Sequence, residues 1–211
     1  MDLQGIKTLV IDFGGVLIDL DRWRCVKHFA ELGLPDVESM LDMCHQHGFF
    51  LQHEQGLLTD EEFRAEIRKR IPHPVTDEQI DEAWNSFLVG IPAYKLDFLL
   101  ELRRRYTVYL LSNTNGIHWQ WALRNAFSYQ GHRVEDFFDR IFLSYEMKLV
   151  KPDVEIFRRL IAETGLNPSE TLFIDDAESN CRAAHSLGIR TYMPLPREDW
   201  RPIFRAEETC G

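Results

Sequence analysis

The chain has 211 residues, 45% of them hydrophobic, which suits one large domain, or a domain with a modest insertion, around a sizeable core. Its formal net charge of -10 argues against a nucleic-acid partner, because such proteins neutralise phosphates with clustered Lys and Arg. No apolar segment is long enough to cross a bilayer and no signal peptide is visible, so no membrane partner is expected. Four widely separated cysteines without metal-ligand spacing favour the reducing cytoplasm.

The first predicted element is a buried strand that ends at Asp12. Residues 9–17 form an apolar run interrupted only by this carboxylate and by Gly14 and Gly15, which let the backbone turn sharply. Ligands of open α/β sheets bind at such strand ends. Asp12 is therefore a candidate nucleophile, and the alternative is that it only caps a turn.

A long helical segment follows this strand. Residues 21–32 are amphipathic, and Thr59 and Thr76 each begin a capping box that predicts a helix start. The segment is too long for a single crossover, so we expect a helical cap at residues 19–90, inserted after the first strand. Its residues 48–58 are expected to face the ligand site.

From Pro92 onward, helices and strands alternate. Strands are predicted at 107–111, 140–143, 171–174 and 190–192, and helices at 92–105, at 153–164 with Pro152 in the first helical position, and at 180–187. This alternation predicts an α/β fold, a doubly wound parallel sheet with right-handed crossovers. The core domain is expected to comprise residues 1–18 and 91–211.

Polar residues gather at the predicted strand ends, namely Asp12, Ser112, Lys151 and the pair Asp175 and Asp176. Each has a simpler explanation: Ser112 as a helix N-cap, Lys151 as a surface lysine, and the aspartates as partners of a helix dipole. Two adjacent carboxylates at a strand tip nevertheless repel each other unless a cation is near. Together the groups suit phosphoryl transfer to a carboxylate, with Mg²⁺ and a lysine offsetting the negative charge.

These motifs, in this order, resemble the haloacid dehalogenase superfamily of hydrolases over the whole chain. The segments around Asp12, Ser112, Lys151 and Asp175 are most similar to the branch that contains α-glucose-1-phosphate phosphatases and the N-terminal phosphatase of epoxide hydrolases. The cap segment from Gln52 onward is similar to the same branch.

The resemblance implies a Mg²⁺-dependent phosphomonoester hydrolase that works through an aspartyl-phosphate. Asp12 would be the nucleophile and a metal ligand, Asp176 a metal ligand with Asp175 as its neighbour or a further ligand, and Gly14 would add its carbonyl oxygen. Lys151 would tie Asp12 to the phosphoryl group.

The substrate is expected to be a small phosphate ester, held partly by the core and partly by the cap. Ser112 and the N–H of Asn113 would bind its phosphoryl group, and His53 and Glu54 of the cap its organic part. We expect a monomer or a homodimer.

The position two residues after Asp12 departs from the pattern of this superfamily. Most of its phosphatases have there an aspartate that acts as general acid and base, whereas this chain has Gly14. Without a proton donor the enzyme would favour a good leaving group, so a sugar phosphate such as glucose 1-phosphate is the expected substrate. The alternative is that Asp19 or Glu54 supplies the missing carboxylate.

Two other functions stay open at this point. A haloalkanoate dehalogenase also uses a carboxylate nucleophile, but it has no metal to hold, and the pair Asp175 and Asp176 argues against it. A catalytically weak protein that senses a phosphorylated metabolite is favoured only by the glycine at position 14.

Overall fold

Five parallel strands form the central sheet of this computed structural model, which describes residues 1 and 3–205. Their order across the sheet is β5 (Arg140–Leu143), β4 (Thr107–Ser112), β1 (Thr8–Ile11), β6 (Thr171–Ile174) and β7 (Arg190–Tyr192). In the centre, Ile11 of β1 lies opposite Leu110 of β4 and Ile174 of β6. The segments that follow these three strands therefore leave the sheet at the same edge.

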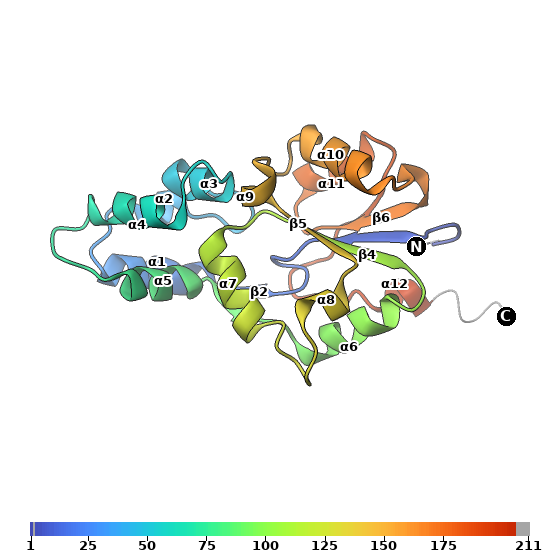
Figure 1. The fold of residues 1–211 in the computed structure, drawn as a ribbon, viewed down its shortest axis with the longest axis horizontal. Helices are drawn as coiled ribbons and strands as arrows, with labels where there is room; N and C mark the ends of the chain where they lie inside the picture. Colours follow the sequence, from blue (N-terminus) through green and yellow to red (C-terminus); the bar gives the residue numbers. More distant parts are fainter. Residues whose placement is uncertain (2, 206–211) are drawn as a thin grey trace.

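Each face of the sheet is covered by its own helices. One face carries α6 (Ala93–Leu102), α8 (Val134–Phe137) and α12 (Pro202–Arg205), and the other carries α10 (Val154–Thr164) and α11 (Glu178–His185), as Figure 1 shows. Successive strand residues point to opposite faces, so Leu9 and Ile11 belong to the first buried cluster and Val10 to the second. The predicted doubly wound α/β fold is confirmed.

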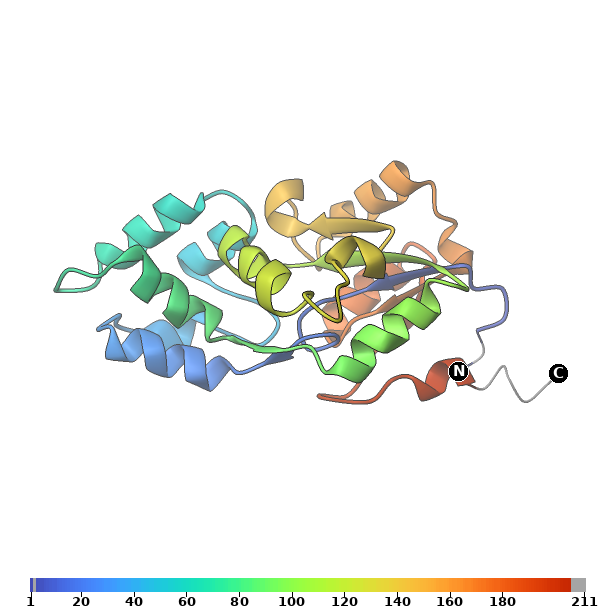
Figure 2. The ribbon, with the colours of Figure 1, turned by 60° about the horizontal axis from the view of Figure 1, so that its bottom comes forward.

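Residues 19–90 lie beside one end of the sheet in both views (Figures 1 and 2). They contain α1 (Arg22–Glu31), α2 (Val37–Met40), α3 (Gly48–Glu54), α4 (Asp60–Arg68) and α5 (Asp77–Asn85). An antiparallel pair, β2 (Asp19–Leu20) and β3 (Leu88–Gly90), joins them to the sheet. We call residues 19–90 the cap, and its boundaries as a domain stay a prediction.

Aromatic side chains fill the interior of the cap. The ring of Phe50 lies 4.9 Å from that of Trp84, 5.3 Å from that of Phe63 and 5.6 Å from that of Phe29, measured between centroids. Each of these rings brings a large apolar area out of water, and such pairs add about 0.5–1.5 kcal/mol beyond that burial. Both predicted capping boxes are present, at Thr59 and Thr76.

Three further elements follow strands or precede them. These are α7 (Gly116–Asn125), which packs against α5 of the cap, α9 (Ser144–Met147) and the 3₁₀ turn η1 (Pro168–Glu170). No helix within residues 1 and 3–205 is both long and apolar enough to span a bilayer.

Two predicted helix starts were wrong. Pro152 is not in the first helical position, because the side chain of Asp153 accepts a hydrogen bond from the backbone N–H of Glu155 and so caps α10 one residue later. The helix predicted from Asn180 begins at Glu178, directly after the turn that Asp175 stabilises.

Candidate active site

Asp12 follows the central strand and is 7% exposed. Its backbone N–H donates to the carbonyl of Ile174 at 2.9 Å, which fixes the residue between the ends of β1 and β6. Its Oδ1 lies 2.7 Å from Nζ of Lys151. Burial raises the pKa of Asp12 to about 8 although Lys151 lowers it, and the charges of Asp175 and Asp176 add to the rise. A cation beside this carboxylate would offset the increase.

Lys151 is a buried lysine at the centre of the site, not a surface residue, with 2% exposure. Its Nζ lies 2.6 Å from Oδ2 of Asp175 as well as 2.7 Å from Asp12, and it donates to the carbonyl of Leu111 at 3.1 Å. Burial lowers the pKa of Lys151, but the carboxylates of Asp12 and Asp175 outweigh this effect and hold the pKa above its ordinary value.

Asn113 holds the backbone of Lys151 from the end of β4. Its Oδ1 accepts the N–H of Lys151 at 2.8 Å, and its Nδ2 donates to the carbonyl of the same residue at 2.9 Å. The side-chain oxygen and nitrogen of Asn113 thus both hold the loop after β4 against the loop that contains Lys151. The lysine is therefore positioned by β4 as well as by its own segment.

The two adjacent aspartates have different surroundings. Asp175 is completely buried, and its carboxylate accepts hydrogen bonds from the N–H of Ala177 at 2.8 Å and from Nδ2 of Asn180 at 3.0 and 3.1 Å. Asp176 is only partly buried and borders the pocket, and burial raises its pKa to about 6, with Asp175 as the next cause. Asp175 is thus arranged to hold Lys151, and Asp176 is free to bind a ligand in the pocket.

The carboxylates at this edge of the sheet lie close enough together for a divalent cation to bind among them. One oxygen from each of Asp12, Asp175 and Asp176 lies within 4.8 Å of the others. Hard cations such as Mg²⁺ prefer carboxylate, carbonyl and water oxygens. Gly14, the expected carbonyl ligand, borders the same pocket.

Gly15 gives a first test of this arrangement. Its φ is +71°, and a Cβ added there would lie 2.0 Å from Oδ2 of Asp176. We expect Gly15→Ala to lower the free energy of unfolding by more than the roughly 1 kcal/mol that such a φ costs, and to weaken Mg²⁺ binding by displacing Asp176. Urea titrations with and without Mg²⁺ measure both effects. The control is Gly131→Ala, which has φ +84° but open space around the added Cβ, and Mg²⁺ binding equal in the two variants would contradict the prediction.

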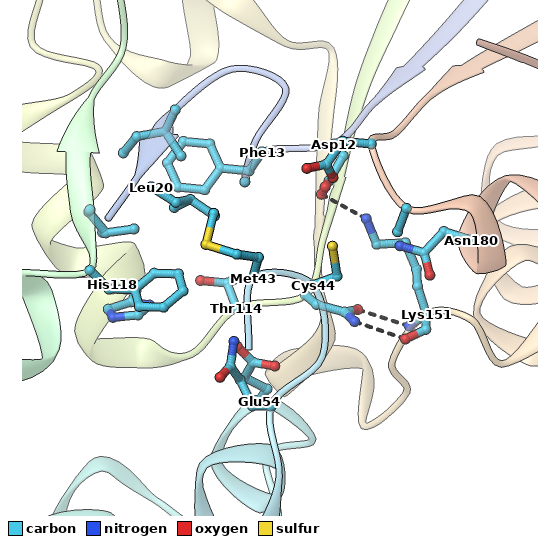
Figure 3. A pocket seen from close by; sticks show the side chains of 18 residues that line it. Asp12, Phe13, Leu20, Met43, Cys44, Glu54, Thr114, His118, Lys151 and Asn180 are labelled. Atoms are coloured by element: carbon cyan, nitrogen blue, oxygen red, sulfur yellow. Dashed lines mark hydrogen bonds and ion pairs between the residues drawn. The ribbon is translucent and has the colours of Figure 1, made fainter. Parts of the chain in front are cut away.

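Core and cap enclose a cavity of about 60 Å³ beside Asp12, with Asp12 and Glu54 on opposite sides of it (Figure 3). Its polar side chains are Asp12, Gln46, Glu54, Asn113, Thr114, His118, Lys151, Asp176 and Asn180. Its apolar ones are Phe13, Ile18, Leu20, Met43, Phe87, Leu88 and Ala177. The cavity thus lies between the cap residue Glu54 and the core residues around Asp12.

Two predicted substrate-binding residues do not line the cavity. His53 is 1% exposed, stacks on Phe63 at 4.2 Å between centroids, and its Nε2 lies 2.8 Å from Oδ1 of Asp60, so its expected contact with substrate is not supported. Ser112 is 1% exposed, and its hydroxyl donates to the carbonyl of Asn113 at 3.3 Å. It lies at the end of β4 next to the cavity without forming its wall.

Other lining residues were missed by the sequence analysis. Met43, Cys44 and Gln46 belong to a cap loop without helical or strand periodicity, so no pattern marked them. His118 of α7 lines the cavity too. Burial lowers its pKa to about 3, and its neutral ring donates through Nε2 to the carbonyl of Trp84 at 3.0 Å.

A parallel α/β sheet with an acidic cluster and a buried lysine at its carboxyl edge defines a hydrolase site of the kind that the sequence predicts. A family model described as haloacid dehalogenase-like hydrolase matches residues 6–188. The chain therefore belongs to the haloacid dehalogenase-like hydrolases.

Relatives with known names or structures agree with this family assignment. The D-ribitol-5-phosphate phosphatase of Bacteroides thetaiotaomicron is 42% identical over 196 residues, which are 93% of this chain and 95% of that protein. A family enzyme of the same organism, solved as an aspartate-to-alanine mutant with magnesium and inorganic phosphate, has a TM-score of 0.92 and 54% identity, covering 95% of this chain and 99% of that one. The predicted superfamily and the predicted enzyme class, a phosphatase of this family, are confirmed.

More distant structures share the fold. A protein of Porphyromonas gingivalis, described as a predicted hydrolase of the same family, has a TM-score of 0.89 and 39% identity, covering 96% of this chain and 98% of that one. A dehalogenase with a TM-score of 0.59 is 18% identical, covering 92% of this chain and 87% of that one, and this likeness concerns the fold alone.

Proposed function

We propose that the protein is a Mg²⁺-dependent phosphomonoester hydrolase that acts through an aspartyl-phosphate on a small sugar or sugar-alcohol phosphate. The observation that carries this proposal is the contact of 2.7 Å between Asp12 and Lys151, within a cluster of carboxylates that border a cavity. The magnesium and phosphate bound in the similar Bacteroides thetaiotaomicron structure support it.

In this proposal, Asp12, Asp176 and the carbonyl of Gly14 hold Mg²⁺. The cation supplies positive charge to the phosphate oxygens and lets Asp12 remain ionised at neutral pH. Asp175 keeps Lys151 in place through their contact of 2.6 Å. The sequence left open whether Asp175 is a neighbour of the metal ligand Asp176 or a further ligand. We propose the first, because the carboxylate of Asp175 already accepts hydrogen bonds from Ala177 and Asn180.

Lys151 and the end of β4 would bind the phosphoryl group. The ammonium group of Lys151 compensates the charge that Asp12 and the phosphate bring together. The N–H of Asn113 and the hydroxyl of Ser112 would donate to phosphate oxygens, the latter after turning away from the carbonyl of Asn113. Asp12 would then attack phosphorus along a path that these groups fix.

The organic part of the substrate is proposed to be a short sugar or polyol. The polar and apolar side chains that line the cavity suit such a group, and the Bacteroides thetaiotaomicron relative that is 42% identical is named D-ribitol-5-phosphate phosphatase. A pentitol 5-phosphate therefore joins glucose 1-phosphate as a candidate. No feature of the site favours dehalogenation, for which the metal-binding Asp176 would have no use.

A panel of phosphate esters tests the proposed function. The purified protein, freed of metal with EDTA, is supplied with Mg²⁺ and with ribitol 5-phosphate, glucose 1-phosphate, glucose 6-phosphate or p-nitrophenyl phosphate. We expect release of inorganic phosphate only when Mg²⁺ is present. Turnover without metal, or no turnover of any ester with Mg²⁺, would refute the proposal.

Asp176→Asn is expected to weaken Mg²⁺ binding while the fold is retained. A ligand that binds only the folded state at 100 times its Kd adds about 2.7 kcal/mol to the free energy of unfolding. Mg²⁺ should therefore raise the thermal midpoint of the wild type, and the same concentration should raise that of Asp176→Asn much less. Asp36→Asn, at an exposed position of the cap, is the matched control. Equal midpoint shifts in all three proteins would contradict the assignment of Asp176.

A further inference from the structure

Among the residues that the structure describes, the core of the site offers no carboxyl group to protonate the leaving oxygen besides the assigned nucleophile and metal ligand. Gly14 stands two residues after Asp12 and has no side chain. Cleavage of the bond between phosphorus and an alkyl oxygen places an electron pair on that oxygen, and a positioned acid accelerates this step by about 10²- to 10⁴-fold. An enzyme for sugar or polyol phosphates therefore needs a proton donor from elsewhere.

The cap brings one carboxylate to this place. Among the described residues, three carboxylates line the cavity, those of Asp12, Asp176 and Glu54. The first is assigned as the nucleophile and the second as a metal ligand. Asp19, the other candidate of the sequence analysis, does not line the cavity and lies 4.0 Å from Nζ of Lys95.

Glu54 is held firmly above the site. It is the last residue of α3 and 6% exposed, and its backbone carbonyl accepts a hydrogen bond of 2.7 Å from the hydroxyl of Ser144 in the core. Two residues further, the carbonyl of Gly56 accepts a hydrogen bond from Lys148. The end of α3 is thus attached directly to the core beside β5, so the position of Glu54 over the cavity is fixed.

The carboxylate of Glu54 is available for chemistry. Within residues 1 and 3–205, no hydrogen bond or ion pair engages its side chain, although buried carboxyl groups normally have partners. Figure 3 shows it reaching from the cap toward the cavity, across from Asp12. Burial raises the pKa of Glu54 to about 8, with Asp12 raising it further and Lys151 lowering it, so the group carries a proton at neutral pH.

We propose that Glu54 is the general acid and base of the reaction, supplied by the cap in place of the residue that Gly14 lacks. This role rests on the proposed phosphatase function. In the first step, an oxygen of Asp12 attacks phosphorus, the bond from phosphorus to the ester oxygen breaks, and that oxygen takes its electron pair together with the proton of Glu54. The products are an alcohol, the aspartyl-phosphate and an ionised Glu54.

The second step restores the enzyme. Water attacks the phosphorus of the aspartyl-phosphate and gives a proton to the carboxylate of Glu54, while the bond from phosphorus to the Asp12 oxygen breaks. Inorganic phosphate leaves, Asp12 is ionised again, and Glu54 is protonated for the next cycle. Because Glu54 belongs to the cap, this chemistry is complete only when cap and core are closed on each other.

Glu54→Gln tests the proposal, with Glu61→Gln, an exposed glutamate of α4, as the matched control. Two esters are compared: ribitol 5-phosphate, or the best alkyl ester of the panel, and p-nitrophenyl phosphate, whose leaving group needs no proton. For Glu54→Gln, kcat/KM should fall by about 10²- to 10⁴-fold on the alkyl ester and remain nearly unchanged on the aryl ester. Slow hydrolysis of the aspartyl-phosphate should give a burst of p-nitrophenol equal to the enzyme concentration.

The outcomes separate this role from the proposed function. The thermal midpoint of Glu54→Gln, expected at or above that of the wild type, verifies that the variant is folded. If the wild type is active and Glu54→Gln lowers kcat/KM equally on both esters, or on neither, the role of Glu54 is refuted while the proposed function stands. A wild type that hydrolyses neither ester with Mg²⁺ refutes the proposed function, and the role of Glu54 with it.

Discussion

Asp12→Asn is expected to lower kcat for phosphate ester hydrolysis by roughly four to six orders of magnitude, as loss of a covalent nucleophile does in other hydrolases. The amide neither attacks phosphorus nor carries the charge that helps to hold Mg²⁺. Steady-state release of phosphate at saturating Mg²⁺ measures the effect. Asp36→Asn is again the control, because it makes the same chemical change at an exposed position.

This loss should not arise from unfolding. Asp12 is one of three neighbouring carboxylates, and removing its charge relieves repulsion on Asp175 and Asp176. Lys151 keeps Asp175 as its partner at 2.6 Å. We therefore expect a thermal midpoint in the absence of Mg²⁺ close to that of the wild type. A folded Asp12→Asn variant with substantial activity would exclude the aspartyl-phosphate mechanism.

The sequence predicts the fold well because local signals and tertiary packing agree. Strands 140–143, 171–174 and 190–192 have the predicted bounds. Of these, the strand at 171–174 lies inside the sheet and is buried throughout, as a short apolar run predicts. The capping boxes at Thr59 and Thr76 place the starts of α4 and α5 correctly. The two short strands of the β2 and β3 pair carry too few residues for any period to be detected.

The core half of the site was predictable for a topological reason. Asp12, Asn113 and Asp175 each follow a strand, and β4, β1 and β6 are neighbours in the sheet. Sequence order alone therefore indicates that these residues meet. It does not reveal that Asp175 is saturated by Lys151, Ala177 and Asn180 while Asp176 faces the cavity, because that depends on side-chain directions.

The cap half of the site was less predictable. His53 and Glu54 are consecutive in α3, and consecutive helical residues point about 100° apart, so they do not both face the cavity. Phe63 stacks on the ring of His53, which leaves Glu54 toward Asp12. The sequence alone does not show which of His53 and Glu54 faces the cavity, because this depends on the position of α3 against the core. The hydrogen bond between the Glu54 carbonyl and the Ser144 hydroxyl fixes that position.

Lys151→Met is expected to affect both stability and activity. It leaves the carboxylates of Asp12 and Asp175 buried without their common partner, and breaking a buried ion pair in this way costs about 3–5 kcal/mol of unfolding free energy. It also removes the positive charge opposite the phosphoryl group, so kcat/KM should fall by about 10²- to 10³-fold. Urea titrations and kinetics at saturating Mg²⁺ measure the two effects, with the exposed Lys27→Met as the control.

A double variant shows whether the two effects are separate. Asp175→Asn, added to Lys151→Met, removes one of the two unpaired charges while its amide stays within reach of Ala177 and Asn180. Part of the lost unfolding free energy should return, because one fewer carboxylate is then buried without a cation. The value of kcat/KM should stay low, since Asp12 and the phosphate would still face each other without a positive charge between them. Recovery of activity together with stability would instead mean that Lys151 acts only as a structural partner of Asp175, and that the charge needed at the phosphoryl group comes from the metal alone.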